Sequence, residues 1–299
     1  MEINETPDTG GGNALLVLTL RYILLQRLQA AIASTAIALE EIPLQRTKDY
    51  RRVQYISAIA LKLANIWQQP AIDVADRIAA HCSQQEENSS FLSREDFTVE
   101  VVPPGMILFE LTDKGVAAWL QRLIDNSPPI GNTEFFDAGD RVFPIQYSHA
   151  RCCSLLRLAH RDRIVTLDEC DRHTSPQHWQ LITPNPIPWL NSNNRLRLFQ
   201  SAELSLVSQL LTTLDHIAPV NNIPALDLLS PERSPNWIKL ANALSEAFQA
   251  FYSQCRIWGE VKTEQPKLAQ ARLGLVIATQ ALLQFILQDL LGVFAPREL

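Results

Sequence analysis

The chain has 299 residues, 46% of them hydrophobic, which is enough apolar material for two globular domains. Its five cysteines have no repeated spacing, which argues against a disulfide framework and indicates a reducing compartment, so we expect a cytoplasmic protein. The formal charge of −6 arises in residues 1–143, with 12 Lys and Arg against 19 Asp and Glu; a basic, phosphate-binding face is therefore expected only in residues 144–299, with 14 against 13.

The N-terminal segment combines a glycine-containing tip with one long apolar stretch. Residues 1–13 are expected to be disordered. Residues 14–39 have membrane-spanning length, but Arg21 and Arg27 lie in the middle, where burial in hydrocarbon is costly. We therefore predict one long helix that ends before Pro43, with no membrane segment and no signal peptide.

The next segment mixes two periodicities. Helical spacing predicts helices over residues 49–67, after Pro70 and over residues 116–124. Strict alternation over residues 97–101 and 107–111 predicts two strands of a β-hairpin.

These patterns divide the first half of the chain into two regions. Residues 14–125 are predicted to hold an N-terminal helix and a small α+β domain. Residues 126–143, rich in Asn, Pro, Gly and Asp, are predicted to be a linker.

The second half is predicted to be a helical bundle. The expected helices cover residues 145–159, residues 199–217, a segment opened by Ser234 and Pro235, and residues 267–291. The last of them is apolar on more than one face, so we place it in the middle of the bundle, ending at Gly292. The proline-rich residues 161–194 predict a loop insertion.

Four strings of residues in the second half stand in a characteristic order. They are Gln146-Tyr147-Ser148-His149-Ala150-Arg151, Phe251-Tyr252-Ser253-Gln254-Cys255-Arg256, Ala271-Arg272-Leu273 and Leu291-Gly292-Val293-Phe294-Ala295-Pro296. They resemble the C-terminal anticodon-binding domain of arginyl-tRNA synthetases, the DALR domain. The resemblance implies that residues 144–299 form an all-α anticodon-binding bundle with an insertion at 161–194.

The first half resembles the additional N-terminal domain of the same enzymes, through residues 60–78 and the hairpin of residues 99–109. In that family an ATP-binding catalytic domain lies between the two. Here about 20 linker-like residues stand in its place, too few for βα units of ~30 residues each. The HIGH and KMSKS signatures are also absent from the sequence. The resemblance therefore implies a mainly α protein that has kept the flanking domains and is not an enzyme.

The resemblance implies that the chain binds the anticodon loop of a tRNA, namely an arginine tRNA, by aromatic stacking. Tyr252 stands where the family has a base-contacting tyrosine, and Tyr147 and Arg151 share one helix face. For Tyr252 the alternative is a ring half packed at the bundle boundary, and for His149 it is a hydrogen bond inside the bundle. The full set of expected tRNA-binding residues is Tyr147, His149, Arg151, Tyr252, Arg256, Phe294 and Leu299.

The hairpin departs from the family pattern. Met106 and Leu108 stand where the family has an aromatic residue and an asparagine that contact a D-loop base, so hydrogen-bonded reading of that base is expected to be lost. The apolar surface left there supports an alternative, a repurposed protein-interaction scaffold that no longer binds RNA. An enzyme whose catalytic domain is supplied by another chain is a third reading.

Three residues of the insertion, Cys170, His173 and His178, have a spacing that could suit a metal ion, but no second paired cluster accompanies them. We expect no metal, no cofactor and no catalytic residues.

Overall fold

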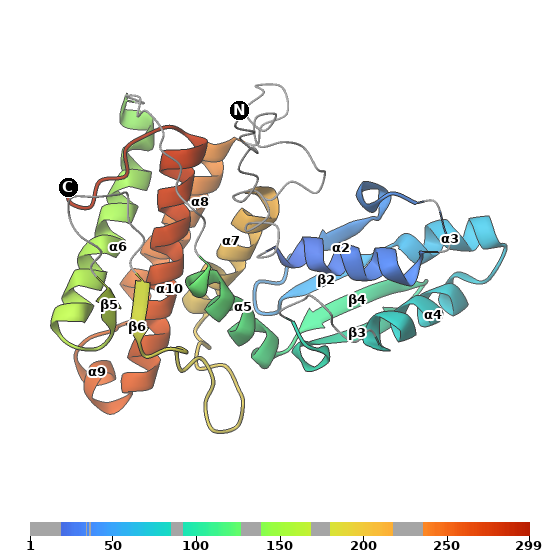
Figure 1. The fold of residues 1–299 in the computed structure, drawn as a ribbon, viewed down its shortest axis with the longest axis horizontal. Helices are drawn as coiled ribbons and strands as arrows, with labels where there is room; N and C mark the ends of the chain where they lie inside the picture. The colour runs from blue at the N-terminus through green and yellow to red at the C-terminus, as the bar shows by residue number, and fades with distance from the viewer. Residues whose placement is uncertain are drawn as a thin grey trace, which may run out of the picture.

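The chain folds into an α+β part and a helical bundle that lie next to each other along the long axis of the molecule (Figure 1). This confirms the predicted mainly α class. The computed structural model describes residues 19–33, 35, 37–84, 92–126, 139–168, 180–217 and 236–299. The predicted N-terminal tip and most of the predicted linker lie outside these ranges.

The N-terminal part is built on a four-stranded antiparallel sheet in the order β1-β2-β4-β3. Its strands are β1 (Leu44–Arg46), β2 (Gln54–Ser57), β3 (Phe97–Val102) and β4 (Met106–Leu111). The predicted hairpin is confirmed as β3 and β4, with Val99 opposite Phe109. Its turn needs Gly105, which has φ +132° and at which an added Cβ would lie 2.9 Å from the Cβ of Ala71.

The predicted helix over residues 49–67 is wrong in its first half. Residues 54–57 form β2, and the helix α3 (Ile59–Trp67) begins only after them. Burial in β2 has a period of two, with Tyr55 and Ser57 covered and Gln54 and Ile56 partly open. The strand pairs with β1 and with β4. Since β4 lies more than 50 residues away, no local pattern predicts that pairing.

Three helices, α2 (Leu20–Ala31), α3 and α4 (Ala71–Gln84), complete this part. The helix predicted to follow Pro70 is confirmed as α4. The helix predicted over residues 14–39 is too long, because α2 ends at Ala31 and both the amide and the hydroxyl of Thr35 donate to the Ile32 carbonyl. Single 3-10 turns follow at Leu39–Glu41, Arg94–Asp96 and Gly139–Val142.

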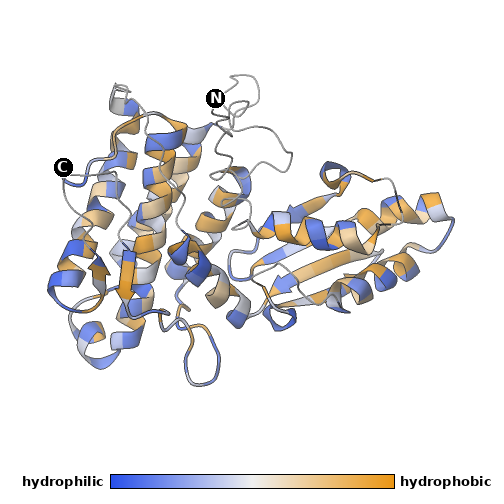
Figure 2. Ribbon diagram, viewed as in Figure 1, coloured by the Kyte–Doolittle hydropathy of each residue, from blue (hydrophilic) through white to orange (hydrophobic). Residues whose placement is uncertain are grey.

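The C-terminal bundle is arranged around one helix. Its elements are α6 (Phe143–Arg161), α7 (Ser201–Ile217), α8 (Trp237–Gln254), α9 (Glu260–Glu264) and α10 (Pro266–Phe285), the last continued by a π-helical turn (Ile286–Leu290). Helix α5 (Asp113–Asp125), predicted as the last helix of the N-terminal domain, also packs against α10. As predicted, α10 is central: 17 of its 20 residues are buried, and it packs against each of the other helices. Figure 2 shows hydrophobic residues along most of it. The segment Pro266–Leu290 is long and apolar enough to cross a membrane, but 89% of its apolar 18-residue window is buried within the fold.

Two helix ends test the predicted capping residues. Gly292 has φ +63° and follows the π-helical turn, as predicted. The start of α8 differs, because its cap is Asn236, whose side chain accepts a hydrogen bond from the Lys239 amide. Ser234 and Pro235, the predicted cap and first residue, lie outside the described residues.

The prediction of a loop over residues 161–194 is wrong for the part that is described. Strands β5 (Thr166–Asp168) and β6 (Gln180–Thr183) pair there in antiparallel fashion. Further on, Ile187 and Trp189 are buried against α10 at Gly274, where an added Cβ would lie 2.3 Å from the Trp189 ring. The insertion therefore supplies part of the bundle core.

The two parts are joined by partly buried polar contacts. The Tyr55 hydroxyl of β2 donates to Asp215 of α7 at 2.7 Å. The Arg46 guanidinium of β1 donates to the Ser208 carbonyl and to the Thr212 hydroxyl of the same helix. Helix α5 packs against both the Arg94–Asp96 turn of the first part and α10 of the second. These contacts fix the sheet directly on the bundle.

Candidate nucleic-acid interface

The predicted tRNA-binding residues come from the first turns of α6, the last turn of α8 and the C-terminal tail after Gly292. Pro144 starts α6, whose inward stripe includes Ser148 and Cys152, so Tyr147 and Arg151 point outward. The Tyr147 ring, which is 48% exposed, and the Arg151 charge therefore lie at the surface.

The fold brings Arg151 and Tyr252 into direct contact, although they are 101 residues apart. The Arg151 guanidinium donates to the Tyr252 hydroxyl and lies over its ring, 4.7 Å from the centroid. Behind Tyr252, the Phe248 ring lies nearly parallel at 6.4 Å and 22°. Tyr252 is 36% exposed, so its ring is half packed at the bundle boundary, as in the alternative given above, and part of it still faces solvent.

A further aromatic residue, which the sequence reasoning missed, extends this surface. Phe143 is 54% exposed, and its ring centroid lies 6.5 Å from that of Tyr147. The four-residue spacing of the two was a signal that could have revealed it. We call Phe143, Tyr147, Arg151 and Tyr252 the aromatic face.

The C-terminal tail runs from α10 to α6 and ends beside it (Figure 1). Gln146 donates to the Phe294 carbonyl at 2.9 Å, which brings exposed Phe294 to the first turns of α6. Leu299 is also exposed, but its neighbour Glu298 pairs with Arg157 at 3.2 Å. Ten residues of helix, about 15 Å, separate Arg157 from Tyr147, but only six, about 9 Å, separate it from Arg151.

His149 is inside the bundle, 1% exposed, and the predicted RNA contact does not fit this position. One ring nitrogen lies 2.8 Å from the Pro296 carbonyl and the other 3.0 Å from the Gln280 amide. Burial lowers the pKa of His149 from 6.5 to about 4, so the imidazole is neutral at pH 7. The alternative reading, an internal hydrogen bond, is correct.

Arg256 lies exposed, just after the end of α8 and one turn beyond Tyr252. Its carbonyl accepts a hydrogen bond from Arg272, the arginine of the Ala-Arg-Leu string. Arg272 is itself buried and paired with Glu203 at 2.6 Å. That string therefore supports the site from within the bundle and does not face solvent.

No metal site is found among the described residues, where no three His, Cys, Asp or Glu side chains cluster. The Cys170, His173 and His178 trio lies outside them. Burial raises the pKa of the adjacent Cys152 and Cys153 thiols well above neutrality, so both are protonated at pH 7.

The sheet of the N-terminal part has a second candidate surface. Val102, Met106, Leu108 and Ile56 are half-buried, and their strand register places them on the opposite face of the sheet from the core residues Phe97, Ile107, Phe109 and Tyr55. We call these four residues the open sheet face. It contains the two positions where the resemblance predicted a changed D-loop contact.

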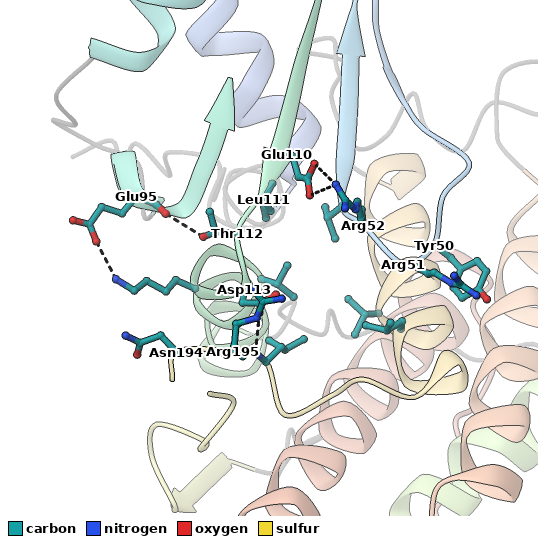
Figure 3. A pocket seen from close by; sticks show the side chains of 16 residues that line it. Tyr50, Arg51, Arg52, Glu95, Glu110, Leu111, Thr112, Asp113, Asn194 and Arg195 are labelled. Carbon is teal, nitrogen blue, oxygen red and sulfur yellow. Dashed lines mark hydrogen bonds and ion pairs between the residues drawn. The ribbon is translucent and has the colours of Figure 1, made fainter. Parts of the chain in front are cut away.

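A cleft of about 650 Å³ lies between the sheet, the start of α5 and residues 194–196 (Figure 3). Three ion pairs cross or flank it: Arg52 with Glu110, Lys114 with Glu95, and Arg195 with Asp113, at 3.1–3.3 Å. Since each carboxylate already has a cationic partner, the cleft presents no concentrated charge. The sequence reasoning did not predict it.

Comparison with known proteins finds two matching domains, and Tyr252 is the one residue of the aromatic face that lies within either match. A family model of the DALR anticodon binding domain matches residues 191–299, and one of the arginyl tRNA synthetase N terminal domain matches residues 22–111. Arginine–tRNA ligases from Synechococcus sp. (strain JA-3-3Ab) and Moorella thermoacetica are 32% and 33% identical over 159 and 163 residues. These matches cover 53% and 54% of this chain but only 22% and 23% of the two ligases.

A third such ligase, from Pelodictyon phaeoclathratiforme, is 35% identical over 158 residues, 53% of this chain and 23% of its own length. No solved structure matches the chain. The bundle thus contains a domain that is similar to an anticodon-binding domain. More particularly, the chain is related to the arginyl-tRNA synthetases and carries their N-terminal and DALR domains.

Proposed function

We propose that the chain is a non-catalytic RNA-binding protein that binds the anticodon loop of an arginine tRNA on its aromatic face. The observation that carries the proposal is the Arg151 guanidinium stacked over Tyr252 beside the exposed rings of Tyr147 and Phe143. Unpaired bases stack on aromatic rings and on guanidinium planes, and each such base contributes ~1–3 kcal/mol.

Stacking also accounts for binding by an acidic chain. Recognition of single-stranded loops depends on ring surfaces as well as on phosphate contacts, so it does not require a large basic patch. One cation on the face, Arg151, is placed to serve both purposes, since its plane offers a stacking surface and its charge a phosphate contact. The cytoplasm, where tRNA is used in translation, is the location we propose.

The test is fluorescence anisotropy with a labelled stem-loop carrying the anticodon arm of an arginine tRNA. Tyr252→Ala is expected to weaken binding about 5- to 150-fold, the equivalent of one base stack, because the Arg151 guanidinium loses the ring that holds its plane in place. Tyr252→Phe keeps the ring and is expected to change affinity much less. Tyr50→Ala, which removes an exposed ring of the N-terminal part, is the matched control. Equal binding by Tyr252→Ala and wild type would refute the proposal.

Salt and anticodon identity separate the components of this binding. Arg151→Gln is expected to reduce the slope of log K against log salt by ~0.7 if that side chain contacts one phosphate of a single strand. The arginine stem-loop is expected to bind more tightly than one with another anticodon. Equal affinity for both would leave loop binding in place and remove the arginine specificity.

The proposed lack of catalysis is supported by the region between the two matched domains. Residues 112–190 hold α5, α6 and a small hairpin in their described part, and every described strand pair of the chain is antiparallel. Nucleotide-binding crevices of class I enzymes need a parallel sheet. Arginine-dependent ATP–pyrophosphate exchange, with an arginine–tRNA ligase as positive control, is expected to stay at background; turnover would refute this part.

A protein-interaction scaffold is the second candidate, favoured by the open sheet face. Leu108 and Ile56 lie side by side on β4 and β2, half-buried, and neither packs against the hydrophobic core. The test compares wild type with Leu108→Asp as baits after nuclease treatment. A protein retained only by wild type, together with no binding of the stem-loop, would favour the scaffold over the RNA-binding protein.

A further inference from the structure

The C-terminal tail is held by a buried polar chain that crosses the bundle. After Gly292, the Val293 amide donates to the Leu287 carbonyl at 2.7 Å, which turns the backbone away from α10. Val293 and Ala295 are buried, whereas Phe294 between them is 56% exposed. The orientation of the Phe294 ring therefore depends on how firmly this backbone is fixed.

Side chains of α6 hold three points of the tail. Gln146 donates to the Phe294 carbonyl, His149 lies 2.8 Å from the Pro296 carbonyl, and Arg157 donates to the Arg297 carbonyl at 3.2 Å. The first contact is exposed and the third is only partly buried, so water competes for the same carbonyls. Only the His149 contact is buried, so it is the one worth most to the tail.

His149 is in turn fixed from the other side by α10. The Gln280 amide donates to the His149 Nε2 at 3.0 Å and to Gln284, and the Gln284 amide donates to Gln288. An acceptor at Nε2 requires the proton to be on Nδ1, which is the nitrogen that faces the Pro296 carbonyl. The Pro296 carbonyl and the Gln280 amide thereby favour the same neutral tautomer, the one that donates to the tail.

At positions 280, 284 and 288, apolar side chains would cost less free energy to bury than amides do. Gln280, Gln284 and Gln288 are each no more than 5% exposed, in a helix otherwise surrounded by hydrophobic residues. Burying three amides is costly unless all are hydrogen-bonded, and an aliphatic residue at 280 would leave the His149 Nε2 buried without a donor. The arrangement therefore makes specific sense as a device for orienting His149.

We infer that His149 and Gln280 are positioning residues that hold the C-terminal tail and so present Phe294 at the RNA-binding surface. Neither touches the ligand. The tail-holding part stands on the geometry alone, whereas the presentation of Phe294 to RNA rests on the proposed function.

The test compares Gln280→Leu with the matched control Gln288→Leu, which removes an equally buried amide at the far end of the chain of glutamines. Release of Leu299 and Glu298 by a carboxypeptidase from the RNA-free protein reports tail mobility, and thermal melting reports general stability. Gln280→Leu is expected to speed release about tenfold, as for the loss of one buried hydrogen bond, and Gln288→Leu to leave it near wild type. Equal release by the two variants would overturn the inference.

Wild-type protein supplies a readout that needs no variant. In ¹⁵N-detected NMR at pH 7, His149 is expected to be neutral with its proton on Nδ1, and the opposite tautomer would overturn the inference.

Stem-loop affinity completes the set: Gln280→Leu and Phe294→Ala are expected to weaken RNA binding by similar factors. A freed tail with unchanged affinity would overturn the presentation of Phe294. Wild type that binds no RNA would overturn the proposed function but not the positioning of the tail.

Discussion

The buried ion pair between Arg272 and Glu203 connects α10 to the start of α7. Their side chains are 2% and 0% exposed, with Nε and Oε1 2.6 Å apart. The second oxygen of Glu203 accepts the amides of Phe199 and Gln200, both at 2.8 Å, and so caps α7. Arg272 also donates to the carbonyl of Arg256, next to the aromatic face. Loss of this arginine is therefore expected to affect two helices at once.

Arg272→Met is expected to cost about 3–5 kcal/mol, because it leaves the Glu203 carboxylate buried without its cation. At roughly 2 °C per kcal/mol for a chain of this size, the melting midpoint should fall by about 6–10 °C. Urea denaturation followed by circular dichroism measures the free energy of unfolding, and an unchanged m-value shows that the comparison is valid.

Two further variants identify the cause of the loss. Adding Glu203→Gln to Arg272→Met removes the unpaired charge, so the double variant is expected to be more stable than Arg272→Met alone. Arg157→Met, which breaks the exposed pair with Glu298, is the matched control and is expected to cost at most about 1 kcal/mol. An Arg272→Met variant within 1 kcal/mol of wild type would refute this account of the bundle core.

Three other predictions follow from buried contacts. The pKa of His149 is about 4 in the folded state and near 6.5 when unfolded, so its contribution to the free energy of unfolding is complete above pH 6.5 and is lost as the pH falls to 4. The loss is about 3 kcal/mol in all. Measured unfolding free energies are expected to show this pH dependence in wild type and to lack it in His149→Gln. Tyr55→Phe is expected to cost about 1–3 kcal/mol, because Asp215 loses its buried donor; a smaller loss on urea denaturation would contradict this. Gly274→Ala is expected to destabilise by about 1–3 kcal/mol, since its methyl group overlaps the Trp189 ring, whereas helix propensity alone would give the opposite sign in a thermal melt.

The candidate site could be predicted from sequence only in part. Tyr147 and Arg151 share a helix face by spacing alone, and the structure confirms that they are adjacent on the surface. His149 stands in the same string, two residues from each, yet it is buried. Which side of α6 faces the bundle depends on α10 and on the tail, more than 130 residues away, and no local pattern reports it.

The fold shows the same division. Helices with strong apolar spacing, such as α4 and α10, and the β3–β4 hairpin with its Gly105 turn were predicted from sequence, because their defining contacts are local. Strand β2 was missed, since its partners are β1 and a strand about 50 residues further along. The strands within the insertion were missed for a similar reason, because short β-pairing leaves little trace in composition.

The sequence by itself determined most of the helices, the β3–β4 hairpin and the kinship with two flanking domains of arginyl-tRNA synthetases. Tertiary structure alone decided that Tyr55 and Asp215, 160 residues apart, join those domains directly, and that Arg151 stacks on Tyr252. The physical reason is that hydrophobic periodicity records how each segment meets the core, whereas contacts between polar side chains distant in sequence depend on how the whole chain packs.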